Sequence, residues 1–533
     1  MDSEAQSARK NSREPGFFSR EAVGSVPWMI LGKLVLFFVY FGISMLTVNG
    51  LGKEKYGVYS LMTNISQYMV VMCSLGLGAA LMRYIPELAA RRNRRGLLHL
   101  IWKTAALQCI AVVVVSMVLL LLRIPLQRLF LAEHVVHFEF FLALACGLAG
   151  LLLLKDFVGT VFTSLFKTRT VALLSMTHGA IWLVLLIVWL RHSPEVGVVF
   201  FVQMLSIICI YSFGAVLLYR HVHTLPWNTD ETGIGKRRTL TFSGTVMLST
   251  ILRMVMFKYS EVFFIAAIGG ATVAGVYDLG YTLPYTVITF LPLALLPIFT
   301  SAFAEAYVRD RSCLGRLISS YYKILMLLAL PVGILGAFYA PDAYRILYKG
   351  TMNEAGALAS VFCIVLLMPL FSMPLSAAIK AKEKVLHMVP MLILQIVVNL
   401  FLDWLLIVKF RLGVWGGISA VAGTFVCTIP FRTIVIRRVL GGLYFPTAFF
   451  FRITFVLTAL ALLLHLLSDK IKLFLWLENQ WLNIGQLFII GLVYLLLFVL
   501  CIRYLGLIRR EDTEDFQALD IPRLNTVLQF LVK

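Results

Sequence analysis

Charged side chains inside long apolar segments are the residues of this sequence best placed to do chemistry. At 100° per residue, Arg253, Glu261 and Lys258 lie at about 0°, 80° and 140° around a helix, so a carboxylate sits between two cations on one face. Such a face could bind an anion, because a guanidinium donates two parallel hydrogen bonds to a phosphate. It could equally form a structural ion-pair cluster between helices. Either interpretation requires the face to point away from lipid.

Other ionisable and aromatic residues lie in further apolar segments. An ionisable side chain in the middle of a bilayer costs about 2.5–3.5 kcal/mol on insertion scales, so it should face water or a partner. Asp278, Tyr281 and Tyr285 form one polar and aromatic stripe at helical spacing, in which the tyrosines could stack on sugar rings or pack against helices. The remaining candidates for the lining of a polar cavity are Lys33, Arg83, Lys155 and Asp156.

A polar ladder occupies a later apolar segment. Gln395, Asn399 and Asp403 recur every four residues, which places them on one side of a helix. Ladders of this kind often hold helices together in lipid, at about 0.6–2 kcal/mol per hydrogen bond. We therefore interpret this ladder as a helix-packing feature.

The sequence contains no recognisable catalytic motif. It lacks a Walker Gly-rich loop, a His-Glu-x-x-His pattern and a paired-aspartate motif at a membrane surface. Seven of the eight cysteines fall in apolar segments, and none has the spacing of metal ligands. We predict no catalytic residue, no metal site and no cofactor, and we expect a transporter rather than an enzyme.

The composition indicates a protein that is integral to a membrane. Hydrophobic residues make up 60% of the 533 positions and charged residues 14%, whereas soluble domains carry about 25% charged residues. The apolar runs are roughly 20 residues or longer, which predicts helices rather than the strands of a barrel. The fold class is therefore an all-α polytopic membrane protein. We predict fourteen transmembrane helices, at about 24–49, 58–82, 101–122, 138–166, 172–190, 196–219, 242–268, 273–303, 320–340, 355–379, 387–408, 412–436, 447–467 and 483–505.

The distribution of positive charge predicts the orientation. With the N-terminus in the cytoplasm, most of the 47 Lys and Arg residues fall in cytoplasmic segments, as the positive-inside rule requires. Both termini are thus expected on the cytoplasmic side of the cytoplasmic (inner) membrane. Because topology accounts for most of the net charge of +20, we expect no nucleic-acid partner.

A short pattern occurs twice in the chain. Gly57-Val58-Tyr59 and Gly275-Val276-Tyr277 are 218 positions apart, and each follows one long apolar segment and opens another. At the same offset, Gly52 matches Gly270 and Glu87 matches Glu305. A register held over two helices predicts a duplicated bundle, and duplicated membrane bundles are typical of transporters with a substrate site between the halves.

The repeat predicts the organisation of the chain. We expect two six-helix lobes related by a pseudo-two-fold axis along the membrane normal, followed by two unrepeated helices. The expected segments are a cytoplasmic tail (1–23), the first lobe (24–220), a cytoplasmic linker (221–240), the second lobe (241–438), helices thirteen and fourteen (439–505) and a cytoplasmic tail (506–533).

Several stretches resemble a known family. Leu51 to Leu61, Leu75 to Gly78 and Arg83 to Glu87 are similar to the opening hairpin of the polysaccharide (O-antigen type) flippases, within the multidrug/oligosaccharidyl-lipid/polysaccharide exporter superfamily. The stretch from Gln395 to Gly423 resembles the eleventh and twelfth helices of the same family. The resemblance extends over about residues 20–505.

This resemblance implies a V-shaped, two-lobed bundle around a central cationic cavity. Such a protein would move a polyprenyl-pyrophosphate-linked oligosaccharide across the membrane by alternating access, during the biosynthesis of a polysaccharide such as lipopolysaccharide O-antigen. Family members carry basic residues in the first helices of each lobe, where this sequence has Lys33, Arg83, Arg253 and Lys258. The implied partners are the lipid-linked oligosaccharide, membrane lipid, and the glycan polymerase and glycosyltransferases of the same pathway.

Two other functions are alternatives to the flippase. A cation/drug antiporter of the same superfamily needs a deep acidic residue in its first lobe, but the first helix has Lys33 and no acid, and Asp156 adjoins Lys155. A membrane-embedded glycosyltransferase or polymerase usually needs a sizeable external loop for its catalytic carboxylates, and the predicted loops are short. Both comparisons favour the flippase.

Overall fold

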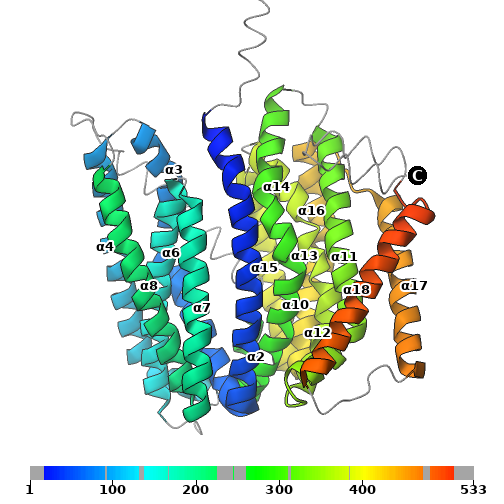
Figure 1. Ribbon diagram of the computed structural model, residues 1–533, viewed down its shortest axis with the longest axis horizontal. Coiled ribbons are helices and arrows are strands. Elements are labelled where there is room, and N and C mark those ends of the chain that lie inside the picture. Colours follow the sequence, from blue (N-terminus) through cyan, green and yellow to red (C-terminus); the bar gives the residue numbers. More distant parts are fainter. Residues whose placement is uncertain are drawn as a thin grey trace, which may run out of the picture. The chain divides into compact units, whose positions relative to one another are not determined.

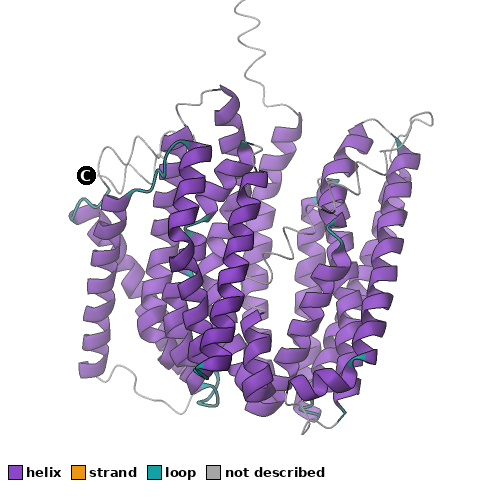
Figure 2. Ribbon diagram, turned by 180° about the vertical axis from the view of Figure 1, so that it is seen from behind, coloured by secondary structure: helices purple, strands orange, loops and turns teal. Residues whose placement is uncertain are grey.

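The computed structural model describes residues 17–90, 93–130, 137–165, 167–224, 244, 260–309, 314–382, 385–471 and 480–508. Within these ranges every regular element is a helix, and no strand occurs (Figures 1 and 2). The α-helices are α2 (Phe17–Ser74), α3 (Leu77–Ala90), α4 (Arg94–Leu121), α5 (Arg123–Leu129), α6 (Phe138–Ser164), α7 (Thr168–His192), α8 (Val196–Thr224), α10 (Ser260–Arg309), α11 (Leu314–Leu347), α12 (Asn353–Val365), α13 (Leu367–Leu370), α14 (Met373–Ala381), α15 (Val389–Asp403), α16 (Gly413–Leu440), α17 (Thr447–Ile471) and α18 (Gln480–Tyr504). A 3₁₀ turn, η3 (Val385–Met388), precedes α15, and a turn of π-helix, η4 (Trp404–Lys409), follows it.

The two longest helices are each interrupted at one glycine. Gly52 divides α2 with φ 72° and ψ 176°, and Gly270 divides α10 with φ 78° and ψ 176°. This backbone conformation is open to glycine but strained for residues with a side chain. The two glycines are equivalent in the sequence repeat, so the local duplication predicted from the sequence recurs as the same backbone break.

Twelve helical stretches of the described residues are long and apolar enough to cross a membrane. One of them contains Gly52 and another contains Gly270, so each of these two stretches includes a break between helical segments. The predicted spans 24–49 and 58–82 lie on either side of Gly52. An all-helical membrane protein is therefore confirmed, whereas the count of fourteen spans stays a prediction.

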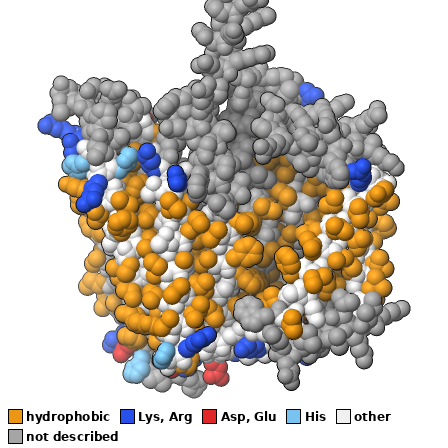
Figure 3. Space-filling model, viewed as in Figure 1, with side chains coloured by type: hydrophobic (Ala, Val, Ile, Leu, Met, Phe, Trp, Pro, Cys, Tyr) orange, Lys and Arg blue, Asp and Glu red, His pale blue; other side chains and the backbone are white. Residues whose placement is uncertain are grey.

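The outer faces of several helices carry large apolar side chains. On α4, Val113, Met117 and Leu121 are exposed, and so are Phe455 of α17 and Phe488 of α18. Figure 3 shows such hydrophobic side chains along the helices, with the charged side chains drawn near helix ends. Because contiguous apolar surface of this extent is unfavourable in water, these faces fit contact with lipid.

The chain forms two compact units, which are described separately. Unit 1 comprises residues 1–50, 65–123 and 139–250, and unit 2 comprises residues 51–64, 124–138 and 251–533. The described part of unit 1 holds α3, α4, α6, α7 and α8 with both flanking parts of α2. Unit 2 holds the short middle part of α2, α5, and the helices from α10 onwards.

Within unit 2, the two copies of the Gly-Val-Tyr pattern meet at backbone contact. A Cβ atom built on Gly57 would lie 2.6 Å from the carbonyl oxygen of Ala271, and one built on Gly275 would lie 2.6 Å from the Cα atom of Gly57. Three residues further along each copy, Ser60 Oγ donates a 2.8 Å hydrogen bond to Asp278 Oδ2. Only residues without a side chain allow α2 and α10 to cross this closely.

Candidate functional site

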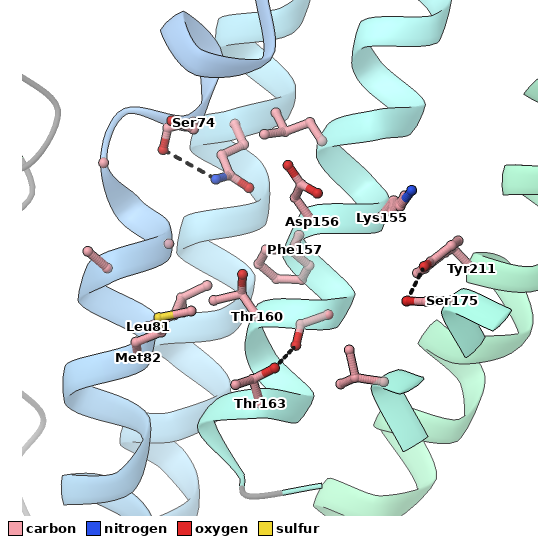
Figure 4. A pocket seen from close by; sticks show the side chains of 17 residues that line it. Ser74, Leu81, Met82, Lys155, Asp156, Phe157, Thr160, Thr163, Ser175 and Tyr211 are labelled. Carbon is pink, nitrogen blue, oxygen red and sulfur yellow. Dashed lines mark hydrogen bonds between the residues drawn. The ribbon is translucent and has the colours of Figure 1, made fainter. Parts of the chain in front are cut away.

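Unit 1 contains a cavity of about 480 Å³. It lies among α3, α4, α6, α7 and α8, with Ser74 at the end of α2 completing the wall (Figure 4). Pockets for small ligands usually measure roughly 300–1,000 Å³ and combine apolar walls with a few polar groups. The cavity in unit 1 has that size and that mixture.

Helix α6 supplies the charged residues of the cavity. Lys155 and Asp156 are consecutive, so their side chains leave the helix about 100° apart. Figure 4 shows the Lys155 nitrogen directed toward the helix that carries Tyr211, and the Asp156 carboxylate directed toward the side of Ser74. Lys155 Nζ donates a hydrogen bond of 3.4 Å to Tyr40 Oη of α2, and Asp156 is exposed. The two predicted site residues thus face different walls of one cavity.

Neutral polar and apolar residues complete the lining. Gln108 of α4, Thr160 and Thr163 of α6, Ser175 of α7 and Tyr211 of α8 contribute amide and hydroxyl groups. The apolar part of the wall includes Leu81, Met82 and Phe157. These residues could not be predicted from the sequence, because single hydroxyl residues on apolar helices carry no signal that separates a cavity wall from a helix contact.

Two glycines leave the cavity open. A Cβ atom built on Gly78 or on Gly159 would meet no heavy atom within 4 Å, and both residues line the cavity. A Cβ atom at either position therefore fits without displacement of the surrounding helices.

The other two predicted site residues of unit 1 lie away from this cavity. Lys33 is half-buried on α2, and Arg83 is exposed on α3, with its guanidinium carbon 6.0 Å from the centroid of the Tyr84 ring. Neither residue lines the cavity.

In unit 2, Glu261 belongs to a buried polar cluster that joins α10 to α15. Its side chain is 0% exposed, and Asn399 Nδ2 donates a 3.0 Å hydrogen bond to Glu261 Oε1. Ser260 Oγ donates in turn to Asn399 Oδ1 over 3.1 Å. Asp403, which is also 0% exposed, lies one helical turn beyond Asn399 on the same side of α15.

This cluster contains carboxylate oxygens without a compensating donor. Among the described residues, neither oxygen of Asp403 nor Oε2 of Glu261 has a hydrogen-bond partner. Two buried carboxyl groups with oxygens left for another partner are suited to hold a proton or a small cation. The predicted flanking cations Arg253 and Lys258 lie outside the described residues, so their arrangement around Glu261 stays a prediction.

The ladder of α15 makes the contacts expected of a packing feature at two of its three positions. Gln395 Nε2 donates to Thr428 Oγ1 of α16 over 3.4 Å, and Asn399 bonds to residues of α10. Asp403 departs from this pattern, because no hydrogen bond to it occurs within the described ranges. It is followed directly by the π-helical turn η4, a local irregularity that is frequent at functional sites.

The predicted stripe on α10 is held by neighbouring residues. Asp278 accepts hydrogen bonds from Ser60 and, over 3.4 Å, from Thr282 Oγ1. Tyr281 and Tyr285 are stacked with their centroids 5.5 Å apart, and Phe362 of α12 packs edge-on against Tyr281 at 5.2 Å. Tyr281 is buried and Tyr285 is 38% exposed. Tyr285 is therefore the member of the pair with ring surface left for another molecule.

Comparisons with known proteins show the family of the chain and proteins that share its fold. The family described as "Polysaccharide biosynthesis protein" matches residues 23–304. No curated protein matches the chain.

Solved structures with the same fold include a flippase and several transporters. Lipid II flippase MurJ, in an inward closed conformation, is 12% identical with a TM-score of 0.67, over 91% of this chain and 100% of that one. An inward-facing multidrug resistance MATE family transporter is 18% identical with a TM-score of 0.59, over 77% and 98% of the two chains. A MOP superfamily transporter from Pyrococcus furiosus, described as having a binding pocket of reverse polarity, is 16% identical with a TM-score of 0.55, over 79% of this chain and 96% of that one. These likenesses show the fold that the chain shares with one flippase and with transporters.

Proposed function

Because the chain belongs to the polysaccharide biosynthesis protein family, we propose that it is a flippase that moves a lipid-linked oligosaccharide across the cytoplasmic membrane. The observation that carries this proposal is that a chain of this family has, over nearly its whole length, the fold of a protein named as a lipid II flippase. The protein is thus a transporter and not an enzyme. Its substrate is a glycan on a polyprenyl pyrophosphate, and its cycle is alternating access.

Four of the five predicted cations share one role in this proposal. Lys33, Arg83, Arg253 and Lys258 hold the pyrophosphate, since a diphosphate needs several positive charges to leave water. The prenyl chain stays in lipid, where it keeps its apolar surroundings. Both termini lie in the cytoplasm, and the glycosyltransferases and polymerase of an O-antigen type pathway act before and after this protein. The proposed organisation is the one predicted from the sequence, with lobes at 24–220 and 241–438.

The cavity in unit 1 supports a substrate with many hydroxyl groups. Its wall places amide, hydroxyl and carboxylate groups within a bundle whose outer faces fit contact with lipid. Polar groups at that depth are costly unless they face water or a polar ligand. The hydroxyl-rich part of a lipid-linked glycan is a ligand that satisfies them.

A second candidate function is cation-coupled transport of a small molecule. The buried carboxylates Glu261 and Asp403 favour it, because they can exchange a proton or a small cation as the protein changes conformation. Coupling of this kind is also compatible with a flippase, so the transported molecule decides between the two functions.

The test uses the purified full-length protein in liposomes that contain a fluorescent polyprenyl-pyrophosphate-linked oligosaccharide. Dithionite bleaches only the outer leaflet, so transport raises the bleached fraction above that of protein-free liposomes. We expect this rise with the lipid-linked glycan and no uptake of cationic drugs. Drug uptake driven by a proton or sodium gradient, without any movement of the glycan, would replace the flippase by the second candidate. Movement of neither would refute both.

A further inference from the structure

An unusual group of aromatic donors surrounds Lys155 in unit 1. The ring centroids of Tyr40 of α2 and Trp182 of α7 are 6.0 Å apart. The Trp182 centroid is 5.9 Å from that of His178, one turn earlier on α7. His178 in turn lies 5.7 Å from Tyr211 of α8. We call these four aromatic residues and Lys155 the donor cluster.

Several donors of this cluster have nothing to bind in the described structure. His178 is 1% exposed and Trp182 is 7% exposed. Among the described residues, neither ring nitrogen of His178 nor Nε1 of Trp182 has a hydrogen-bond partner. A buried polar group left unpaired costs about 1–3 kcal/mol, so native structures normally supply a partner. These two neighbouring side chains therefore hold donor groups that a ligand could use.

The charge of the donor cluster selects the ligand. Lys155 makes its hydrogen bond to Tyr40 and forms no ion pair within the described part of the chain, and the adjacent Asp156 points to another wall of the cavity (Figure 4). The cluster therefore offers one positive charge together with the neutral donors of Trp182, Tyr40 and Tyr211. One cation in an apolar surrounding compensates a single negative charge, whereas a diphosphate would keep an uncompensated charge.

The position of the cluster indicates what carries that charge. Lys155 and Tyr211 belong at once to the cluster and to the wall of the cavity, and Ser175 Oγ lies 3.4 Å from Tyr211 Oη. Beyond Lys155, the cavity continues along Thr160, Gln108 and Asp156, whose oxygens accept hydrogen bonds from hydroxyl groups. A molecule whose oxyanion binds at Lys155 would thus have its hydroxyl groups next to a wall that can accept their hydrogen bonds.

We propose that the donor cluster binds one singly charged oxyanion that belongs to a sugar, so that the unit 1 cavity accepts an acidic sugar residue of the transported glycan. This inference rests on the proposed function, which supplies the glycan. The same oxyanion chemistry could be offered by the phosphodiester of a lipid headgroup, and the ligands of the test separate the two sources.

The experiment measures direct binding to the full-length protein in detergent micelles. Saturation-transfer NMR follows titrations with sodium glucuronate, with glucose and with sodium dimethyl phosphate. The variants are Lys155→Met, which keeps the length of the side chain and removes its charge, and Gly159→Leu, which fills open space of the cavity. Lys167→Met is the matched control, because Lys167 is exposed in the turn after α6 and does not line the cavity. Elution as a single species in size-exclusion chromatography checks that each variant is folded.

We expect glucuronate to bind more tightly than glucose and dimethyl phosphate, with a dissociation constant raised at least about tenfold in Lys155→Met and unchanged in Lys167→Met. Gly159→Leu should abolish binding. Equal binding of glucose and glucuronate, or an unaltered dissociation constant in Lys155→Met, overturns the proposal. Stronger, Lys155-dependent binding of dimethyl phosphate overturns the sugar assignment in favour of a lipid headgroup.

The outcome for this site is separable from the outcome for the flippase. Binding of glucuronate is measured without a membrane gradient or a lipid carrier. Lys155-dependent binding without glycan movement in liposomes would leave the acidic-sugar site in place and remove the flippase. Glycan movement without glucuronate binding would keep the flippase and remove the acidic-sugar site.

Discussion

A methyl group added where α2 and α10 cross within unit 2 gives a sharp test of the packing described above. In Gly57→Ala, the new Cβ atom would lie 2.6 Å from both the Ala271 oxygen and the Thr272 Cα atom. Both neighbours are backbone atoms, so no side-chain rotation can relieve the clash. The two helices must separate locally, and the contact between Ser60 and Asp278 must lengthen with them.

The expected change in the unfolding free energy of Gly57→Ala is the difference between two opposing effects. Overpacking in a tightly packed region costs typically about 1–3 kcal/mol, and rigid backbone neighbours place this substitution toward the upper end. Replacement of glycine by alanine inside a helix returns only about 0.5–1 kcal/mol. We expect a net destabilisation of about 1–2 kcal/mol for Gly57→Ala, and a similar loss for Gly275→Ala, whose Cβ atom would lie 2.6 Å from Gly57 Cα.

The assay is the free energy of unfolding from SDS titration of the purified protein in mixed micelles. The matched control is Gly159→Ala, because a Cβ atom there meets nothing within 4 Å. The control should be unchanged or more stable by up to about 1 kcal/mol. The double variant Gly57→Ala/Gly275→Ala should lose less than the sum of the single losses, since both methyl groups force apart the same crossing. Full stability of Gly57→Ala would refute the backbone contact.

Three further predictions concern charged groups and their partners. Asp403→Asn should make transport in liposomes insensitive to a proton or sodium gradient, because the amide has nearly the shape of the carboxyl group but cannot exchange a proton. Its unfolding free energy should be unchanged or raised, and a fully gradient-dependent variant would contradict the carboxylate role. Ser60→Ala should cost about 1–3 kcal/mol in the SDS titration, since buried Asp278 loses a hydrogen-bond donor, and Ser60→Ala combined with Asp278→Ala should cost less than the sum of the two single losses. Arg253→Glu should abolish surface glycan in cells that depend on this protein, with normal membrane insertion by immunoblot; unimpaired surface glycan would count against an anion site at Arg253.

The helices could be predicted from the sequence because long apolar runs have one stable solution in lipid. The equivalence of Gly52 and Gly270 was also visible, since a positive φ demands glycine and the repeat kept it in register. The helix count was harder. The backbone leaves helical geometry at one glycine only in α2 and in α10, so each described stretch includes residues that the sequence assigns to two spans.

The polar clusters could be predicted only in part. Lys155 and Asp156 stood out because charges are rare in apolar segments. Their neighbours His178, Trp182 and Tyr211 did not, because 13% of the chain is aromatic and nothing local distinguishes a ring that lines a site from one that fills a core.

The buried polar cluster that joins α10 to α15 could also be predicted only in part. Glu261 was considered with cations on its own helix and Asp403 with amides on another, and the hydrogen bonds of Asn399 join the two sets only in three dimensions. Pairing between distant segments is a tertiary property that helical spacing does not contain.

The hydrogen bond from Ser60 to Asp278 has a consequence for the origin of the duplicated segment. Two separate, identical subunits meeting at this point would bring each residue against its own copy, so an aspartate would confront an aspartate and a serine a serine. The first arrangement sets like charges together, and the second lacks the strong charge-assisted bond. A serine bonded to an aspartate across this junction therefore requires two halves of different sequence, and a fused chain provides them because its halves accumulate separate substitutions.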